Sequence, residues 1–349
     1  MILRSLAWIL ALALCSCGEV NELPLDASSA DAAIFHDAGR TDANFSDANF
    51  SDASSFEPWA MVVLPDTQRY TDAFPDIFDA QTEWIANNAE DLNLKYVLHV
   101  GDVTEWSSVA EWNRAKASIA TMTSEVPLAV VPGNHDYYRD RVRDSPLADY
   151  FPVADFQSMP SYGGLFEPER MDNSFHLFEV NGQQWLILAL EWGPRDSALA
   201  WANTVLDNNP ADHVVVLTHA YLYLDSTRYD WATRGTSQDW NPHSYPASRW
   251  PEVNDGEEIW QKLITQRSNV DFVVCGHAAR EGLGRLTSTT STGAIVHQLL
   301  ANFQDGASGG AGYLRIMEFR EDEIRVRTYS PWLDHFFTGP DNEFTLAWP

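Results

Sequence analysis

The segment LAVVPGNHD, residues 128–136, joins an apolar run to Gly133, Asn134, His135 and Asp136. The apolar run has the length and composition of a buried β-strand. The four residues that end the segment add nothing to a hydrophobic core. They therefore indicate a strand that delivers polar side chains to a functional site.

Four other apolar runs of the chain end in the same way. The runs and the residues after them are MVVL (61–64) before Asp66 and Gln68, YVLHV (96–100) before Asp102 and Glu105, VVVL (214–217) before His219, and FVVC (272–275) before His277. Helices predicted over residues 78–88 and 110–124 separate the three apolar runs 61–64, 96–100 and 128–131. This β-α-β-α-β order predicts a largely parallel sheet. The carboxyl ends of parallel strands lie at one edge of the sheet, so we expect the polar side chains to converge there as a metal centre. Glycines precede Asp102, Asn134 and His277, and we expect them to let the backbone turn sharply.

The second half of the chain continues with strand-like segments. We expect strands over residues 174–180, 184–190, 213–217, 270–275 and 294–300, and an antiparallel closing pair over 312–319 and 323–329. Two long loops, 138–172 and 221–257, are rich in polar and aromatic residues. Loops of this length inside a compact domain are usually functional.

The charge balance restricts the partners. The chain of 349 residues has 22 basic and 50 acidic residues, a net charge of −28. Nucleic-acid binding rests on Lys and Arg meeting phosphates, so DNA and RNA are disfavoured. Phosphate chemistry on such a chain is expected to recruit cations, and we expect a monomer.

The N-terminus resembles that of an exported lipoprotein. Residues 1–16 have a basic start and a short apolar stretch, which indicates a signal peptide, and Cys17 lies where a bacterial lipoprotein would be acylated. An ordinary secretory signal is the alternative. Residues 17–58 repeat Asp, Ala, Ser and Asn and predict a disordered acidic tether. We therefore expect a folded domain over 59–349, held at a membrane on the periplasmic or cell-surface side.

The motifs D-x-Q, G-D-x-x-E and G-N-H-D, an isolated strand-end histidine and a late G-H occur in the order found in calcineurin-like metallophosphoesterases. The resemblance extends from residue 59 to about 348. LPDTQ (64–68), GRLTS (284–288) and VHQLLAN (296–302) resemble a bacterial secreted subgroup with a D-x-Q first motif. The resemblance implies a four-layer α/β/β/α sandwich. It also implies one or two divalent ions that activate water to hydrolyse a phosphate mono- or diester.

The resemblance also implies roles for individual residues. Asp102 would bridge the two metal ions. Asp66 and Gln68 would bind the first ion, and Asn134, His219 and His277 would bind the second. His135 would protonate the leaving group, and Asp136 would orient the imidazole of His135. Gln68 and Ala279 stand where the family usually has histidine. The first site is thus left with oxygen donors, which suit Mg²⁺ or Mn²⁺, whereas the second suits Zn²⁺, Mn²⁺ or Fe²⁺.

Several further residues have two interpretations. Arg280 and Arg285 either hold a substrate phosphate or are surface arginines. His297 is a replacement ligand or a plain strand histidine, and Glu191 faces the metals or caps its strand. His243 lies in the aromatic loop 221–257, which either shapes a substrate pocket or packs as a loop core.

Two rival functions remain open at the level of the sequence. A catalytically weak pseudo-enzyme that binds a phosphorylated or glycan ligand would explain the missing first-site histidines. A surface adhesin would fit the tether and the acidity, but it leaves the strand-end residues unexplained.

Overall fold

Two seven-stranded sheets form the centre of the computed structural model, which describes residues 56–280 and 282–349. The first sheet has the order β13 (His335–Phe337), β12 (Ile324–Ser330), β11 (Leu314–Phe319), β1 (Trp59–Leu64), β2 (Leu94–His99) and β3 (Leu128–Val130), with β14 (Glu343–Leu346) also paired to β12. The second has the order β4 (Tyr162–Leu165), β5 (Ser174–Val180), β6 (Gln183–Leu190), β7 (His213–Thr218), β8 (Val270–Cys275), β10 (Ile295–Ala301) and β9 (Leu283–Thr289).

The expectation of a parallel sheet is right for the strands that deliver the polar residues. Strands β1, β2 and β3 are parallel in the first sheet, and β6, β7, β8 and β10 are parallel in the second. The margins are antiparallel, and they include the predicted closing pair, β11 and β12. The ligand-bearing strands are therefore divided between two mixed sheets.

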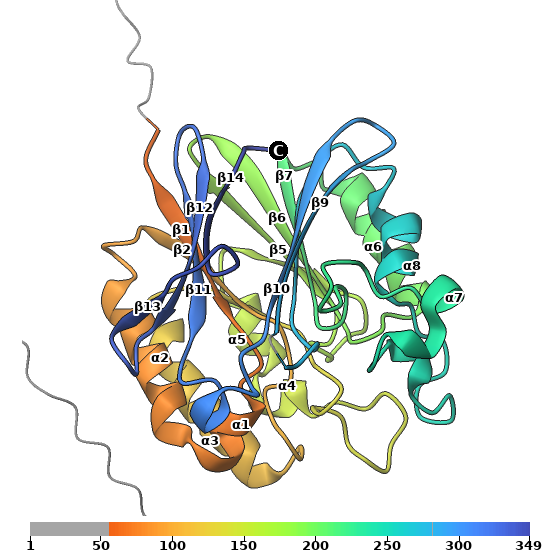
Figure 1. Cartoon of the computed structure of the whole chain (residues 1–349), viewed down its shortest axis with the longest axis horizontal. Coiled ribbons are helices and arrows are strands. Elements are labelled where there is room, and N and C mark those ends of the chain that lie inside the picture. Colours follow the sequence, from red (N-terminus) through yellow and green to blue (C-terminus); the bar gives the residue numbers. More distant parts are fainter. Residues whose placement is uncertain (1–55, 281) are drawn as a thin grey trace, which may run out of the picture. The chain divides into compact units, whose positions relative to one another are not determined.

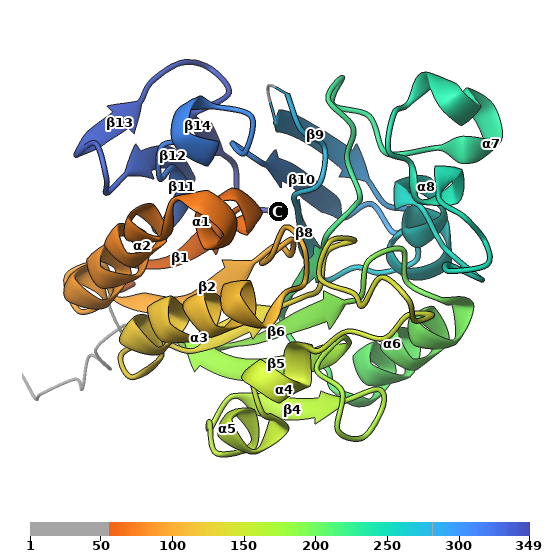
Figure 2. The same ribbon diagram turned by 90° about the horizontal axis from the view of Figure 1, so that it is seen from below.

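Helices cover the outer face of each sheet, which gives the predicted four-layer α/β/β/α sandwich (Figures 1 and 2). On the first sheet lie α1 (Gln68–Ala73), α2 (Pro75–Asn88) and α3 (Val109–Thr123). On the second lie α6 (Asp196–Asn208) and α8 (Gly256–Ile259), which runs into a π-helical turn at Trp260–Ile264. A third apolar layer between the sheets packs residues of β1, β2 and β11 against residues of β6, β7 and β8.

Local sequence explains where the helices begin. Pro75 occupies the first turn of α2, where a missing N–H costs nothing. Ser108 and Glu111 form a reciprocal capping box at the start of α3. The sequence-based prediction missed α6, although its buried residues recur at helical spacing, at 198, 199, 202, 205 and 206.

The two long loops carry short elements and are fixed to the core. Loop 138–172 contains α4 (Leu147–Tyr150), α5 (Val153–Gln157) and β4, and loop 221–257 contains α7 (Trp231–Arg234). The buried guanidinium of Arg143 donates to the carbonyls of Gly193 and Glu252, at 2.8 and 2.6 Å. This contact ties the first loop to the second, so both are anchored where they border the site.

The predicted signal peptide, Cys17 and most of the predicted tether lie outside the described residues. The last tether residues do contact the domain, since Phe56 packs edge-on against Trp348 and the Glu57 N–H donates to Asn181 Oδ1 at 3.1 Å. Within residues 56–280 and 282–349, no helix has both the length and the hydropathy needed to cross a bilayer. Cys275, the last residue of β8, is free and fully buried.

Candidate metal centre

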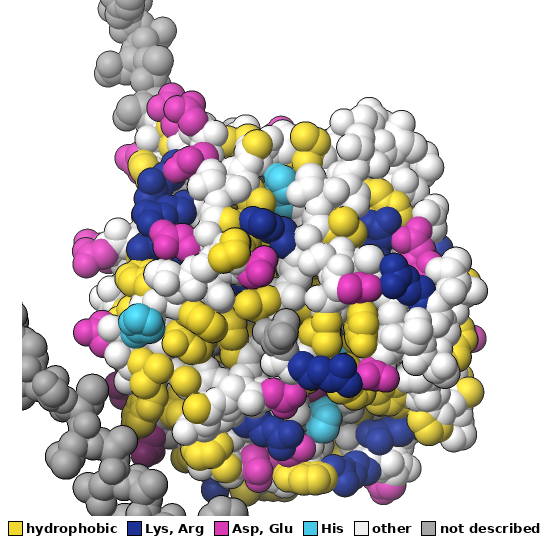
Figure 3. Space-filling model, viewed as in Figure 1, with side chains coloured by type: hydrophobic (Ala, Val, Ile, Leu, Met, Phe, Trp, Pro, Cys, Tyr) yellow, Lys and Arg dark blue, Asp and Glu magenta, His cyan; other side chains and the backbone are white. Residues whose placement is uncertain are grey.

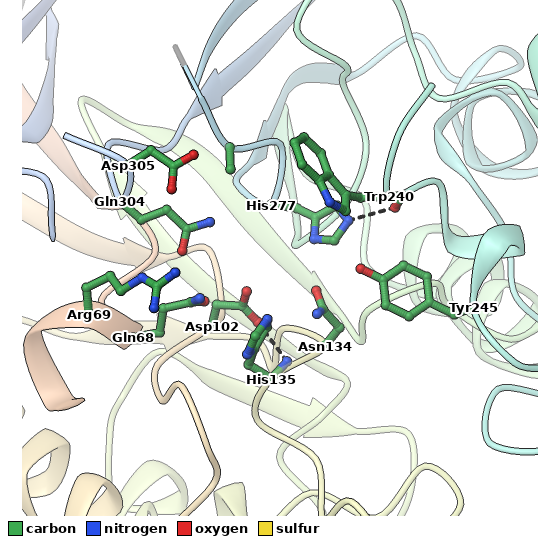
Figure 4. A pocket seen from close by; sticks show the side chains of 11 residues that line it. Gln68, Arg69, Asp102, Asn134, His135, Trp240, Tyr245, His277, Gln304 and Asp305 are labelled. Atoms are coloured by element: carbon green, nitrogen blue, oxygen red, sulfur yellow. Dashed lines mark hydrogen bonds between the residues drawn. The ribbon is translucent and has the colours of Figure 1, made fainter. Parts of the chain in front are cut away.

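A cavity of about 210 Å³ lies where the carboxyl ends of the parallel strands meet (Figure 4). Gln68, Asp102, Asn134, His135 and His277 line it. These residues come from the segments that follow β1, β2, β3 and β8, which belong to both sheets. The convergence expected from the sequence is therefore present in the fold.

Two histidines beside Asp102 direct one ring nitrogen each toward the same point. His219 Nδ1 lies 2.8 Å from the Val100 carbonyl and His277 Nε2 lies 2.8 Å from the Trp240 carbonyl, so both of these nitrogens donate. The remaining nitrogens, His219 Nε2 and His277 Nδ1, are 3.2 Å apart. Asp102 Oδ2 lies 3.3 Å from His219 Nε2. A carboxylate and two imidazole nitrogens lie this close together, and the other nitrogen of each ring is bonded to a backbone carbonyl, so the three side chains form a fitting site for a divalent cation.

Among the predicted ligands, Asn134 Oδ1 and Gln68 Oε1 are buried amide oxygens to which no group donates a hydrogen bond. The Gln68 amide nitrogen donates to Glu105 Oε2 at 2.7 Å, and this contact fixes which end of the side chain is left free. A buried acceptor without a partner costs roughly 1–3 kcal/mol. A cation in the cavity removes that cost, so both oxygens fit the metal-ligand roles expected for them.

The carboxylates of Asp66 and Asp102 are buried without a Lys or Arg partner among the described residues. Asp66 accepts hydrogen bonds from the His277 N–H at 3.2 Å and from Asn302 Nδ2 at 2.9 Å. Burial, reinforced by the charge of Asp102, raises the pKa of Asp66 to about 8. Burial acts the same way on Asp102, but the adjacent His219 holds its pKa below the usual range. Two adjacent buried carboxyls of this kind are stabilised in their charged forms by a cation.

Gln304 offers a candidate metal-ligand oxygen that the sequence-based prediction missed. Ala279, which stands where the family usually has histidine, lines the cavity and offers no ligand atom. Gln304 lines the same cavity, and its Oε1 is buried without a partner. Figure 4 shows its side chain pointing toward Gln68 and Asp102. The Asn302 side chain links Gln304 to the site, because its Oδ1 accepts from the Gln304 N–H at 3.0 Å while its Nδ2 donates to Asp66.

The orientation of His135 does not come from Asp136, and that expectation is wrong. His135 Nδ1 lies 2.8 Å from the backbone carbonyl of Glu105, with the Glu105 carboxylate at 4.0 Å. Asp136 instead accepts from the N–H groups of Val103, Thr104 and Gly133, at 3.0, 2.8 and 2.9 Å, and from the Thr104 hydroxyl at 2.9 Å. Burial and the charge of Asp102 raise the pKa of Asp136 to about 7, whereas these donors favour its ionised form. Asp136 therefore joins the loop after β2 to the loop after β3.

The glycines before the ligands act mainly by leaving space. Only Gly101 has a positive φ, +99°, whereas a Cβ on Gly133 would lie 2.1 Å from Asp102 Oδ1 and one on Gly276 would lie 2.1 Å from Asp66 Oδ1. Positive φ falls on the ligands themselves, at +48° for Asp102 and +71° for His277. Such backbone positions cost about 1–3 kcal/mol in residues other than glycine and are typical of functional sites.

Arg285, His297 and His243 do not line the metal cavity, so they are neither substrate contacts nor replacement metal ligands there. Arg285 on β9 lies over the Phe344 ring at 4.5 Å. His297 is bound to Thr287 and to the Ala347 carbonyl, at 3.1 and 2.9 Å, so it is a plain strand histidine. His243 pairs with Glu258 at 2.6 Å in a separate cavity.

Arg280 lies near the rim of the metal cavity, over the Trp240 ring at 5.1 Å and paired with Asp239 at 2.7 Å. Glu191 does not face the metal site, because Arg195 and Arg143 pair with it at 2.8 and 3.4 Å. Two aromatic residues of loop 221–257, Trp240 and Tyr245, do line the metal cavity. Arg69 also lines it, and its pairing with Glu105 at 3.3 Å was not anticipated from its place beside Gln68.

Comparison with known proteins agrees with this site. The sequence profile of the calcineurin-like phosphoesterase family matches residues 61–281. The chain is 31% identical over 304 residues to the uncharacterized protein YvnB of Bacillus subtilis, an alignment that covers 83% of this chain and 22% of YvnB. The chain thus spans about a fifth of the length of that relative. A solved purple acid phosphatase from yellow lupin superposes with a TM-score of 0.50 at 14% identity, covering 84% of this chain and 54% of the lupin chain. The profile match and the shared fold lead to one conclusion: this chain belongs to the calcineurin-like phosphoesterase family.

Proposed function

We propose that the chain hydrolyses phosphate mono- or diesters with divalent ions bound at the candidate metal centre. The observation that carries the proposal is the convergence of ligand atoms around the Asp102 carboxylate, namely the partnerless amide oxygens of Gln68 and Asn134 and one ring nitrogen each of His219 and His277. When bound, divalent ions lower the pKa of water and neutralise the charge that develops on a phosphoryl group. The chain itself supplies the ligands and a cavity of about 210 Å³.

His135 is the proposed general acid. Its Nδ1 is fixed by the Glu105 carbonyl, so the imidazole is held with Nε2 as the nitrogen available for proton transfer. Its ring lines the cavity beside Asn134 and is about one-third exposed, which suits a group that delivers a proton to a leaving oxygen. Arg69 is positioned to hold a phosphate oxygen, while Trp240 and Tyr245 would contact the rest of the substrate.

The proposed metal sites differ in their donors. The second site combines Asp102 and Asn134 with the two imidazoles and suits Mn²⁺, Fe²⁺ or Zn²⁺. The first site has Asp66, Gln68 and Asp102, and we include Gln304 as a further oxygen donor. Oxygen-only sites suit Mg²⁺ or Mn²⁺, which agrees with the resemblance to a D-x-Q subgroup.

A pseudo-enzyme is the second candidate, and the substitutions at Gln68 and Ala279 favour it. Two buried, partnerless side-chain oxygens weigh against it, because a site adapted to a single metal has no use for Gln68 Oε1 or Gln304 Oε1. The fixed imidazole of His135 also weighs against it, since ligand binding alone needs no proton donor.

We also propose that the protein is exported and anchored to a membrane through an acylated Cys17. The support is the signal-like segment 1–16 and the acidic repeats that follow it. On the face shown in Figure 3, Lys and Arg are interspersed with acids, which agrees with a small phosphate ester as the substrate. We also propose that the chain is a monomer.

The test is hydrolysis of aryl phosphate mono- and diesters by the purified chain, measured metal by metal. Chelation is expected to abolish turnover, and Mn²⁺ or a similar ion to restore it. Asp102→Asn is expected to lose metal, whereas His135→Ala keeps the metal and loses about 10²–10⁴-fold in rate. The pseudo-enzyme is the correct reading if no phosphate ester turns over with any divalent ion.

A further inference from the structure

A second hollow adjoins the metal cavity and is not explained by metal binding. Its volume is about 200 Å³, and it shares Asn134, His135 and Tyr245 with the metal cavity. Its own lining includes Arg139 from loop 138–172 and Arg249 from loop 221–257. A ligand in the metal cavity can therefore extend past His135 toward two arginines.

These two arginines differ from most others in this acidic chain. Arginines close to the site are paired with carboxylates, as Arg69 is with Glu105 and Arg280 with Asp239. Within the described residues, neither Arg139 nor Arg249 forms an ion pair. The acid that lines the hollow with them, Glu105, is already bound by Arg69 and Gln68.

Among the described residues, the two guanidiniums contact aromatic rings and backbone carbonyls but no carboxylate. Arg139 lies over the Trp106 ring at 4.3 Å. Arg249 donates to the carbonyls of Tyr137 and Tyr138, at 3.2 and 3.4 Å, and its Nε is buried without an acceptor. Burial and the neighbouring charge of Arg139 lower the pKa of Arg249. Two like charges near one hollow are stabilised by an anion between them.

Arg249 lies over the ring of Trp250, at 5.2 Å, and other aromatic side chains pack against this tryptophan. Trp250 is buried and packs edge-on against Tyr137 at 4.7 Å and Trp192 at 4.4 Å. Arg143 binds the carbonyl of Pro251 and that of Glu252, at 3.3 and 2.6 Å, just past this tryptophan. Because the loops that carry Arg139 and Arg249 are joined in this way, the two arginines are held in place before a ligand arrives.

We propose that Arg139 and Arg249 form a subsite for a second phosphate group of the substrate, next to the phosphoryl group held at the metal centre. The inference rests on the proposed function and narrows its substrates to phosphate esters that carry a second phosphate group, such as bisphosphates. Arginine presents a planar set of donors that matches phosphate oxygens, and charge-assisted bonds of this kind are the strong ones. His135 and Tyr245 lie in both hollows, at the place where the two groups would be joined.

Binding of methylenebisphosphonate to the Mn²⁺-loaded protein, compared with methylphosphonate by calorimetry, tests the subsite. The P–C–P link is stable to hydrolysis, so the measurement does not depend on turnover. In the double variant Arg139→Ala/Arg249→Ala, bisphosphonate affinity is expected to fall at least tenfold while methylphosphonate affinity stays within about twofold. The matched control is Arg141→Ala, an exposed arginine of the same loop that pairs with Asp144.

The outcomes separate this subsite from the proposed function. Equal losses for both phosphonates would mean that the arginines act only as general charge near the metals, and no loss for either would mean that they do not contact the ligand. Both results overturn the subsite. Metal content and circular dichroism check that the double variant is folded, and the single variant Arg139→Ala, at an exposed position, gives a partial loss if the subsite is real. A chain that hydrolyses no ester but shows the selective loss would retain the subsite and lose the proposed activity.

Discussion

Replacing Asp136 by asparagine separates its two possible roles. In the structure Asp136 Oδ1 accepts from the N–H and the hydroxyl of Thr104, and Oδ2 accepts from the N–H groups of Val103 and Gly133. An asparagine keeps one acceptor oxygen. Its best orientation directs that oxygen at Val103 and Gly133 and its NH₂ at the Thr104 hydroxyl, which leaves the buried Thr104 N–H without an acceptor.

The expected cost follows from these contacts. One stranded buried N–H costs about 1–3 kcal/mol, and the remaining bonds lose the strength that the carboxylate charge gave them. We expect Asp136→Asn to lower the free energy of unfolding by roughly 3 kcal/mol, which corresponds to a Tm lower by about 6–12 °C in a domain of this size. Asp102 and Asn134 lie on the two loops that Asp136 joins, so metal affinity should fall by about 10–100-fold.

Thermal unfolding and metal titration of Asp136→Asn, His135→Ala and a control variant give the answer. The control is Asp140→Asn, an exposed acid in the loop after Asn134, which should change neither quantity. His135→Ala should lose rate while its Tm and metal content stay near those of the parent. If Asp136→Asn instead behaves like His135→Ala, with normal stability and metal binding but a slow rate, Asp136 acts through the imidazole and the structural argument is refuted.

Three further predictions concern the metals, the pH response and the membrane. Titration of metal-free protein with Mn²⁺ is expected to show one tight and one weak binding site. Gln304→Ala should lower the affinity of the weak site, and Gln68→His should raise it. Two equally tight sites in the parent would refute the predicted difference between the metal sites. Burial lowers the pKa of His176 to about 4. Between about pH 6.5 and pH 4, His176 therefore binds a proton in the unfolded chain but not in the folded chain. Folding stability should therefore fall between about pH 6.5 and pH 4, and His176→Gln should flatten that part of the urea-unfolding profile; an unchanged slope would mean that other groups cause it. Cys17→Ala is expected to release active protein into the soluble fraction, and retention at the membrane would place the anchor elsewhere.

The sequence alone was enough to predict the strands that carry ligands, because each apolar run and the polar residues that follow it are adjacent in the chain. An apolar run reads as a buried strand, and residues such as Asp102 or Asn134 directly after it must lie at the strand's carboxyl end. Capping residues likewise determine helix starts, as Ser108 and Glu111 do for α3. Such signals extend over a few residues and need no knowledge of the remainder of the chain.

The tertiary structure decided everything that depends on which distant segments meet. Asp136 and His135 are neighbours in sequence, yet the carboxylate turns to Thr104 and the imidazole to the Glu105 carbonyl. Gln304 lies far from Gln68 along the chain, and only the fold brings its partnerless oxygen to the same cavity.

The same reason explains the surface residues that the sequence misassigned or missed. Arg285 and Arg139 are both arginines in polar surroundings, and nothing local distinguishes them. Packing places the first over Phe344 and the second beside Arg249 in the hollow next to His135. The sequence gives the chemical type of each side chain directly. Which partner each side chain contacts depends on the long-range packing of the two sheets and the two loops.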